Sequence, residues 1–340
     1  MGNSVSFATR AAGPRGRAQR MARLVLLAAL PAVVLLALMR GAADVAPGDV
    51  LRALAGSGDA STLLIVRGIR LPRVALALLV GGALGMSGAV LQGTLRNPLA
   101  EPYLLGVSGG AAVGAVLAVA AGVAPPAFIA LAAFAGAVLA VAGVLALSRM
   151  AGGRDARTLL VAGVVIGAFA NATIMVVMAT AAPDVTRNAL WWMMGSVAAA
   201  GWRDVTLLGA VLLVVGAALL HRARALDVLA LGVESADALG IDAERSGRDF
   251  FLLASLLAAA TVAVAGLVGF VGLLVPHLAR AIAGGRSRPV LATSALAGAV
   301  LVVAADLGAR TARAPAELPL GAVTALLGVP FFLWRLRGRG

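Results

Sequence analysis

The sequence predicts an all-α polytopic membrane protein with about ten transmembrane helices. Of its 340 residues, 61% are hydrophobic and 13% are charged, whereas about a quarter of the residues of a soluble domain carry charge. A span needs about 20 apolar residues, so a chain of this length has room for ten spans joined by short loops. The arginines lie at the ends of the apolar stretches, where basic residues set the orientation of membrane helices.

Ten apolar stretches separated by polar breaks are the candidate spans. They cover residues 24–39, 74–95, 104–122, 125–148, 158–182, 203–220, 250–268, 270–283, 290–308 and 318–334. The first follows a basic segment and precedes small residues, which also fits a cleaved signal peptide, but Arg40 interrupts that pattern and favours an uncleaved helix. The chain then divides into a basic N-terminal tail (1–23), a membrane domain (24–334) and a basic C-terminal tail (335–340).

The stretch 250–279 decides the topology, because thirty uncharged residues exceed one span. A single helix would be about 45 Å long, against a hydrocarbon core about 30 Å thick. If the stretch crosses twice, with a short second helix after Gly266, Gly269 and Gly272, then 19 of the 28 arginines lie on one side. The positive-inside rule makes that side cytoplasmic. We therefore predict two passes and place both termini in the cytoplasm.

Two missing residue types exclude several classes of chemistry. The chain has no lysine, which a P-loop needs on the nucleotide phosphates and a Schiff-base enzyme needs as its amine. It has no cysteine, so thiolate metal sites and disulfides are excluded. The two histidines lie on separate segments without nearby carboxylates, and we expect no metal site and no cofactor bound by this chain. The net charge of +13 is not gathered on one basic face, so we expect no nucleic-acid partner.

Three arginines at the predicted outer end of the second span oppose the charge trend. Arg67, Arg70 and Arg73 are spaced by three, with Pro72 near the expected start of the helix. They either extend to outer headgroups or form a docking surface for an acidic partner. Near the end of the ninth span, Asp306 and Arg310 are four residues apart, a spacing that allows them to pair on one helix face.

Turn residues mark a cytoplasmic elbow between the second and third spans. Asn97 and Pro98 form one turn, Pro102 follows Glu101 in a second, and Gly106 opens the next helix. Elsewhere, glycines recur four residues apart and predict close helix packing in lipid. These pairs include Gly81/Gly85 and Gly163/Gly167.

The longest predicted inner loop, at about 222–248, has the composition of a small amphipathic module. Charged residues alternate with leucines, and Gly232 and Gly240 are suitable ends for two short helices. Its apolar side needs a cover. Periodicity alone does not choose between the membrane surface and a cytosolic protein.

Several motifs, taken in order, closely resemble those of FecCD-type permease subunits of bacterial binding-protein-dependent ABC importers. The resemblance runs from about Arg67 to the C-terminus. Its motifs are RLPR, QGTLRNPLAEPYLLGVSGGA, WWMMGS, LALGVESADALG, GFVGLLVPHLAR, and ADLGAR followed by AELPLGAVTALLGVPFF.

The resemblance implies a type II ABC importer permease with ten helices, in the bacterial inner membrane. Two permease subunits, which we expect to be identical, would surround one pathway for an iron-siderophore, haem or vitamin B12. Two cytosolic ATPase subunits would bind ATP and Mg, and an extracytoplasmic binding protein would deliver the metal chelate. The chain itself would be no enzyme.

The resemblance also assigns roles to residues. It implies docking of the binding protein at Arg70, Arg73 and Arg310. Contact with the ATPase is implied for Leu226, Leu229, Leu231, Gly232, Glu234, Ala236, Leu239 and Gly240. The remaining motif residues are structural: Asn97, Pro98, Pro102, Gly106, Pro276, His277, Asp306 and Pro319.

Two departures from the family pattern and one alternative function remain. An Asp-His-Arg patch is replaced by Gly284–Pro289, and Val233 stands where the family's first coupling glutamate is usual; both bear on the ATPase contacts. An ion-coupled secondary transporter would need ionisable residues inside its spans, for which Asp306 is the candidate. An intramembrane enzyme is disfavoured because no catalytic group is present.

Overall fold

The computed structural model describes residues 14–41, 43–152 and 156–337, and every regular element in these ranges is helical. Seven helical stretches are long and apolar enough to cross a membrane, and three shorter apolar helices accompany them. The long ones are α1 (Pro14–Met39), α4 (Leu71–Thr94) with the turns before it, α6 (Pro126–Met150), α7 (Ala156–Thr180), α9 (Trp202–His221), α12 (Ala243–Ala265) and α14 (Ser287–Thr311). The shorter ones are α5 (Val107–Ala120), α13 (Val271–Ala283) and α15 (Leu320–Arg337). Each of these ten overlaps one of the ten predicted spans, although several begin earlier than predicted.

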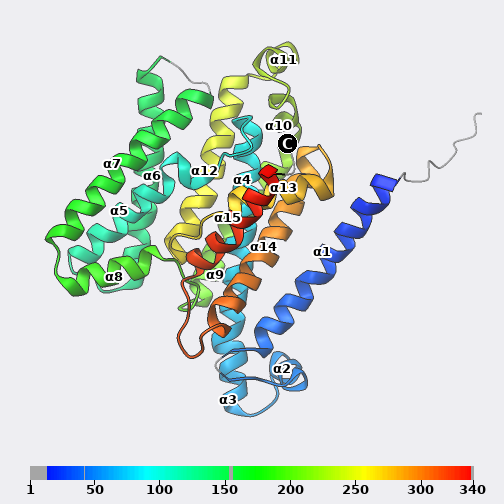
Figure 1. The fold of residues 1–340 in the computed structure, drawn as a ribbon, viewed down its shortest axis with the longest axis vertical. Coiled ribbons are helices and arrows are strands. Elements are labelled where there is room, and N and C mark those ends of the chain that lie inside the picture. Colours follow the sequence, from blue (N-terminus) through cyan, green and yellow to red (C-terminus); the bar gives the residue numbers. More distant parts are fainter. Residues whose placement is uncertain (1–13, 42, 153–155, 338–340) are drawn as a thin grey trace, which may run out of the picture.

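Short helices lie at both ends of the bundle. At one end are α10 (Ala223–Leu229) and α11 (Val233–Ala238), and at the other are α2 (Pro47–Leu54) and α3 (Ala60–Leu63). We call these the α11 end and the α3 end (Figure 1). The helix α8 (Pro183–Met193), which the sequence did not predict, lies in the half of the molecule nearer α3.

The first helix begins ten residues before its predicted span, at Pro14 rather than 24. Proline fits the first helical position, and the basic segment that follows contains good helix formers. Much of the predicted tail is therefore helical, while residues 1–13 lie outside the described ranges. Arg23 donates to the carbonyl oxygens of Ile282 and Ala283 at 3.2 and 3.1 Å. The start of α1 and the end of α13 thus lie on the same side.

The second span also begins earlier than predicted. Helical turns run from Ala60 to Thr94 without a break, and those of Leu64–Arg70 are π-helical. Pro72 is the second residue of α4, near its start as predicted, but helical turns also precede it. Because proline cannot donate a backbone hydrogen bond, the wider π-type turns before it accommodate the missing donor.

The stretch 250–279 is divided as predicted. Helix α12 ends at Ala265, Gly266 adopts a positive φ of 65°, and α13 starts at Val271. With α12 following α11 and α13 ending beside the start of α1, the chain crosses the bundle twice (Figure 1).

Glycines allow α4 and α14 to touch at backbone distance. A Cβ on Gly81 would overlap the carbonyl oxygen of Gly298, and a Cβ on Gly298 would overlap that of Gly81. Gly85 approaches the backbone of Ser294 in the same way. The predicted close packing is confirmed here, whereas a Cβ on Gly167 of α7 would meet no atom of the described residues within 4 Å.

Candidate functional site

A cluster of charged side chains lies at the α3 end, between α4 and α14. Arg73 donates through Nε and Nη2 to Asp306 at 2.9–3.1 Å. It also donates through Nη1 and Nη2 to the two carboxylate oxygens of Glu317, at 2.7 and 2.9 Å. The side chains of Arg73 and Asp306 are 8% and 2% exposed, and that of Glu317 is 40% exposed. Two carboxylates thus enclose one guanidinium, an arrangement that gives strong, directional hydrogen bonds.

Two further arginines cap the last turn of α1. Arg310 on α14 donates to the carbonyl oxygen of Ala37, and its Nε lies 3.6 Å from Asp306 Oδ2, which confirms the predicted pairing of those residues. Arg70 donates to three carbonyl oxygens, those of Leu38, Met39 and Ala43. The final carbonyls of a helix lack partners within the helix, and the negative end of the helix dipole also stabilises cations there. The cluster therefore joins α1, α4 and α14.

The predicted docking arginines are consequently buried. Arg70, Arg73 and Arg310 are each 5–7% exposed, and each donates at least one hydrogen bond within the chain. The sequence did not show that Asp306 and Glu317 fold onto Arg73, and the docking role of the three arginines stays a prediction. Arg67 and Arg313 are exposed at this end.

The connection between α4 and α5 packs into the break between α12 and α13. Glu101 accepts a hydrogen bond from Phe270 N at 2.7 Å, and Tyr103 Oη accepts one from Val268 N at 2.9 Å. The side chains thus satisfy backbone amides that no helix satisfies, as the interior of a membrane protein requires. Sequence reasoning missed both roles, although a carboxylate in an otherwise apolar elbow was an available signal.

The elbow itself has the predicted turns. Asn97 Oδ1 accepts from Leu99 N at 2.9 Å, and Pro98 follows it. Pro102 begins a short 3-10 helix (Pro102–Leu105), and Gly106 has a φ of 81° at the residue before α5. That left-handed conformation suits glycine because it has no Cβ.

Two other motif residues lie inside α13, and a third lies at a helix start. Pro276 is buried and His277 half-buried within α13. Pro319 directly precedes α15, whose first amides donate to the carbonyl oxygens of Gly195 and Met194 at 3.1 Å. In the part of the chain that the structure describes, no group of three or more His, Cys, Asp or Glu side chains could hold a metal ion.

Gln92 connects α4 to α13, a role that the sequence did not indicate. Its Nε2 donates to the carbonyl oxygens of Gly272 and Leu273 at 3.3 and 3.1 Å. Its Oε1 accepts from Arg280 Nη1 at 2.6 Å. A buried amide in an apolar helix was the available signal.

The predicted coupling loop forms a small module at the α11 end. Leu226, Leu229 and Ala236 face its interior and are 1%, 7% and 0% exposed. The module is tied to α14 by Asp227, whose carboxylate accepts from Ser287 N at 2.6 Å. Gly232 has a φ of 121° between α10 and α11. The structure therefore divides the eight predicted coupling residues into an inner and an outer set.

The outer set includes two exposed leucines. Leu231 and Leu239 are 68% and 62% exposed, on turns at either end of α11, which projects from the bundle (Figure 1). Val233, which is not among the eight predicted residues, begins α11 and is 53% exposed. Glu234 and Gly240 are exposed beside them, and Gly232 is half-buried. Of the eight predicted residues, the exposed ones are those that a partner could contact.

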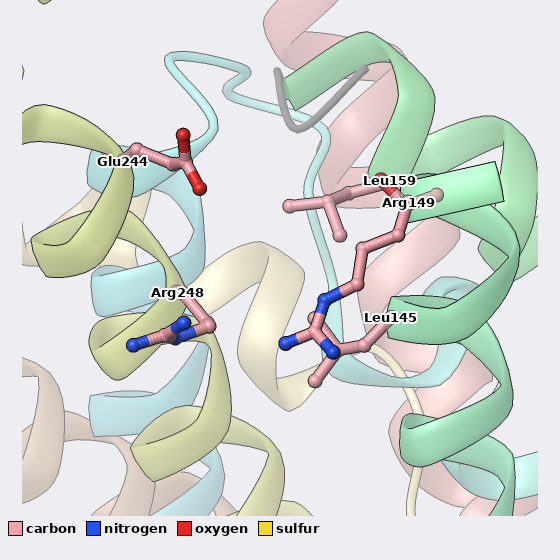
Figure 2. Close-up of a pocket in the computed structure, with 6 residues that line it drawn as sticks. Leu145, Arg149, Leu159, Glu244 and Arg248 are labelled. Carbon is pink, nitrogen blue, oxygen red and sulfur yellow. The ribbon is translucent and has the colours of Figure 1, made fainter. Parts of the chain in front are cut away.

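A narrow cleft lies near this module, between α6, α7 and α12. Figure 2 shows Arg149 extending from α6 towards the helix that carries Glu244 and Arg248. The cleft has a volume of about 30 Å³, which is room for one or two water molecules. It is too small for a metal chelate.

Comparison with known proteins agrees with the fold and its motifs. The chain is 43% identical to the cobalamin import system permease protein BtuC of Halobacterium salinarum, over 81% of this chain and 74% of that protein. It is 42% identical to the hemin transport system permease protein HmuU of Yersinia pestis, over 78% and 81% of the two chains. It is 40% identical to the Fe(3+) dicitrate permease protein FecD of Escherichia coli, over 78% and 83%.

A solved structure shares the whole architecture. It is described as an inward-facing conformation of a metal-chelate type ABC transporter, and the two align with a TM-score of 0.81 over 92% of this chain and 97% of the other, at 28% identity. Residues 27–338 match the FecCD transport family. Because that match covers nearly all of the ten spans, the chain belongs to the FecCD transport family.

Proposed function

We propose that this chain is the permease subunit of a binding-protein-dependent ABC importer for a metal chelate. Relatives are permeases for cobalamin, hemin and ferric citrate, so we infer an iron-siderophore, haem or cobalamin-type solute. The observation that carries the proposal is the uncovered apolar surface of Leu231, Val233 and Leu239 on a ten-span bundle. Such a surface needs a partner, and an ATPase subunit is the partner that supplies energy.

The charges of the module favour a protein over the membrane as that partner. Glu234 and Asp237 on α11 are exposed beside the apolar residues. The cytoplasmic surface of a membrane is itself negative, so these carboxylates would be repelled by its headgroups. A cytosolic protein with an apolar groove and basic rim suits the same surface.

Removal of the apolar side chains is expected to release the ATPase subunit. The double substitution Leu231→Ala and Leu239→Ala should weaken its binding about 100-fold, because each buried leucine contributes about 1.5 kcal/mol or more. Co-purification of the ATPase with the permease measures this. Leu213→Ala is the control, since Leu213 is 73% exposed on the span α9. Equal ATPase retention in both variants would argue against coupling here.

We also propose a docking route for the binding protein at the opposite end. Arg73 can bind a carboxylate of a partner if the partner displaces Glu317, whose side chain is 40% exposed. The hydrogen bond from Arg73 lowers the pKa of the Glu317 carboxyl, so it is ionised at neutral pH and competes as a charge. Arg70 and Arg310 would support this surface by holding the end of α1 beside it, and Arg67 and Arg313 would add exposed positive charge.

Glu317→Gln is expected to strengthen binding of the substrate-binding protein several-fold. The substitution removes the charge that competes for Arg73, and a partly exposed ion pair of this kind contributes about 1 kcal/mol. Asp306 stays as the buried partner of Arg73. Affinity of the binding protein for the assembled transporter measures the effect. Asp184→Asn on α8 is the exposed control. Weaker binding by the glutamine variant would mean that Glu317 supports the surface instead of competing for it.

The remaining assignments extend this proposal. Two copies of the chain would enclose the pathway, and ATP and Mg would bind to the separate ATPase subunits. The α11 end would face the cytoplasm of a bacterium across its inner membrane. The start of α1 and the end of α15 lie nearer that end in Figure 1, which supports cytoplasmic termini.

A further inference from the structure

An apolar groove runs along α12 between α6 and α9. Its volume is about 430 Å³, and Phe128, Leu131, Phe134, Leu207 and Val264 are among its lining residues. Phe128, Leu131 and Leu207 are more than half exposed, so the groove opens on the surface of the bundle. Among the described residues, Arg203 is the one charged side chain that lines it.

A second cavity continues the groove towards the connection between α8 and α9. It has a volume of about 530 Å³ and shares part of the groove's lining, including Arg203 and Val264. Its wall adds Trp191, Trp192 and Asp204. Tryptophan favours the depth at which membrane meets water. The two cavities together therefore form one apolar groove, and the end of this groove near Trp191 is polar and aromatic.

Arg203 occupies an unfavourable place for a cation. It is the second residue of α9, where the helix dipole is positive and favours anions. Among the described residues, no carboxylate forms an ion pair with it. Its neighbour Asp204 accepts from Gly201 N at 3.1 Å and so caps the helix. An anion from outside the chain would be favoured by both the guanidinium and the helix terminus.

We propose that this groove binds a phospholipid with an ethanolamine headgroup. The phosphate would meet Arg203, the ammonium would meet Asp204, and an acyl chain would lie along Leu131, Leu207 and Val264. Adjacent positive and negative side chains at one mouth match the adjacent charges of that headgroup, whereas an anionic lipid would be repelled by Asp204. The site is separate from the ATPase and docking surfaces.

Lipid binding to the purified complex of permease and ATPase tests the proposal. Native mass spectrometry with added phosphatidylethanolamine or phosphatidylglycerol should show a preference for the ethanolamine lipid in the wild type. Arg203→Gln should weaken that binding about tenfold or more, because a charge-assisted hydrogen bond is lost. Arg187→Gln, on the exposed face of α8, should leave it unchanged.

A second variant tests the headgroup separately from the fold. Asp204→Asn keeps an oxygen that can accept from Gly201 N but removes the negative charge, so it should shift the preference towards phosphatidylglycerol. Equal binding of both lipids by the wild type, or no change in Arg203→Gln, would overturn the proposal. So would dissociation of a permease dimer by Arg203→Gln without loss of lipid, since the groove would then be a protein interface.

Discussion

Replacing Asp306 with alanine is expected to destabilise the protein by about 3–5 kcal/mol, the usual cost of removing one partner from a buried ion pair. Asp306 is 2% exposed and accepts three hydrogen bonds from Arg73, and Arg310 lies 3.6 Å away. Without it, Arg310 would lose its nearest carboxylate and Arg73 would keep only Glu317. Thermal unfolding of the purified variant in detergent measures the loss.

The exposed pair Arg40–Asp44 supplies the control for that experiment. Its residues are also four apart in sequence, but the two side chains are 59% and 60% exposed. Asp44→Ala should therefore change stability by no more than about 1 kcal/mol. A similar loss in both variants would show that burial of Asp306 does not decide its contribution.

Gly298→Ala is expected to have the second largest effect. The new Cβ would overlap the carbonyl oxygen of Gly81, which is backbone and cannot rotate away. Helices α4 and α14 would have to separate, and their separation would also pull Arg73 from Asp306. Overpacking costs about 1–3 kcal/mol and occasionally more; we expect about 3 kcal/mol, measured as a lower unfolding temperature.

Gly167→Ala on α7 is the matched substitution. In the part of the chain that the structure describes, no atom lies within 4 Å of a Cβ at Gly167, and alanine favours a helix by about 1 kcal/mol over glycine. The unfolding temperature of this variant should stay equal or rise. If Gly298→Ala behaved in the same way, the close contact between α4 and α14 would not hold the bundle together.

The sequence could predict the spans because hydropathy and charge are local properties. The division of 250–279 followed from the length of one apolar stretch and the arginines around it. The pairing of Arg73 with Asp306 could not be predicted, since 233 residues separate them and any outer carboxylate was an equal candidate. Helix α8 was missed because its polar residues interrupt the apolar pattern by which spans are recognised.

The coupling segment could be predicted in outline because its motif is also a local property of the sequence. The coupling segment was recognised from its motif, but which leucines face inward depends on where α10 and α11 turn at Gly232. Leu226 and Leu231 look alike in the sequence, yet they are 1% and 68% exposed. The roles of Glu101 and Tyr103 depend on an elbow meeting a helix break about 165 residues away.

The arginine contacts of α1 also set the order in which the protein can be completed during synthesis. Its last turn accepts a hydrogen bond from Arg310, which is made 273 residues after Ala37. Its basic end contacts Ile282 and Ala283, which follow Arg23 by about 260 residues. At about 5–20 residues per second, that interval is roughly 14–55 s. The helix that leaves the ribosome first therefore waits in the membrane until the ninth span has been inserted beside it.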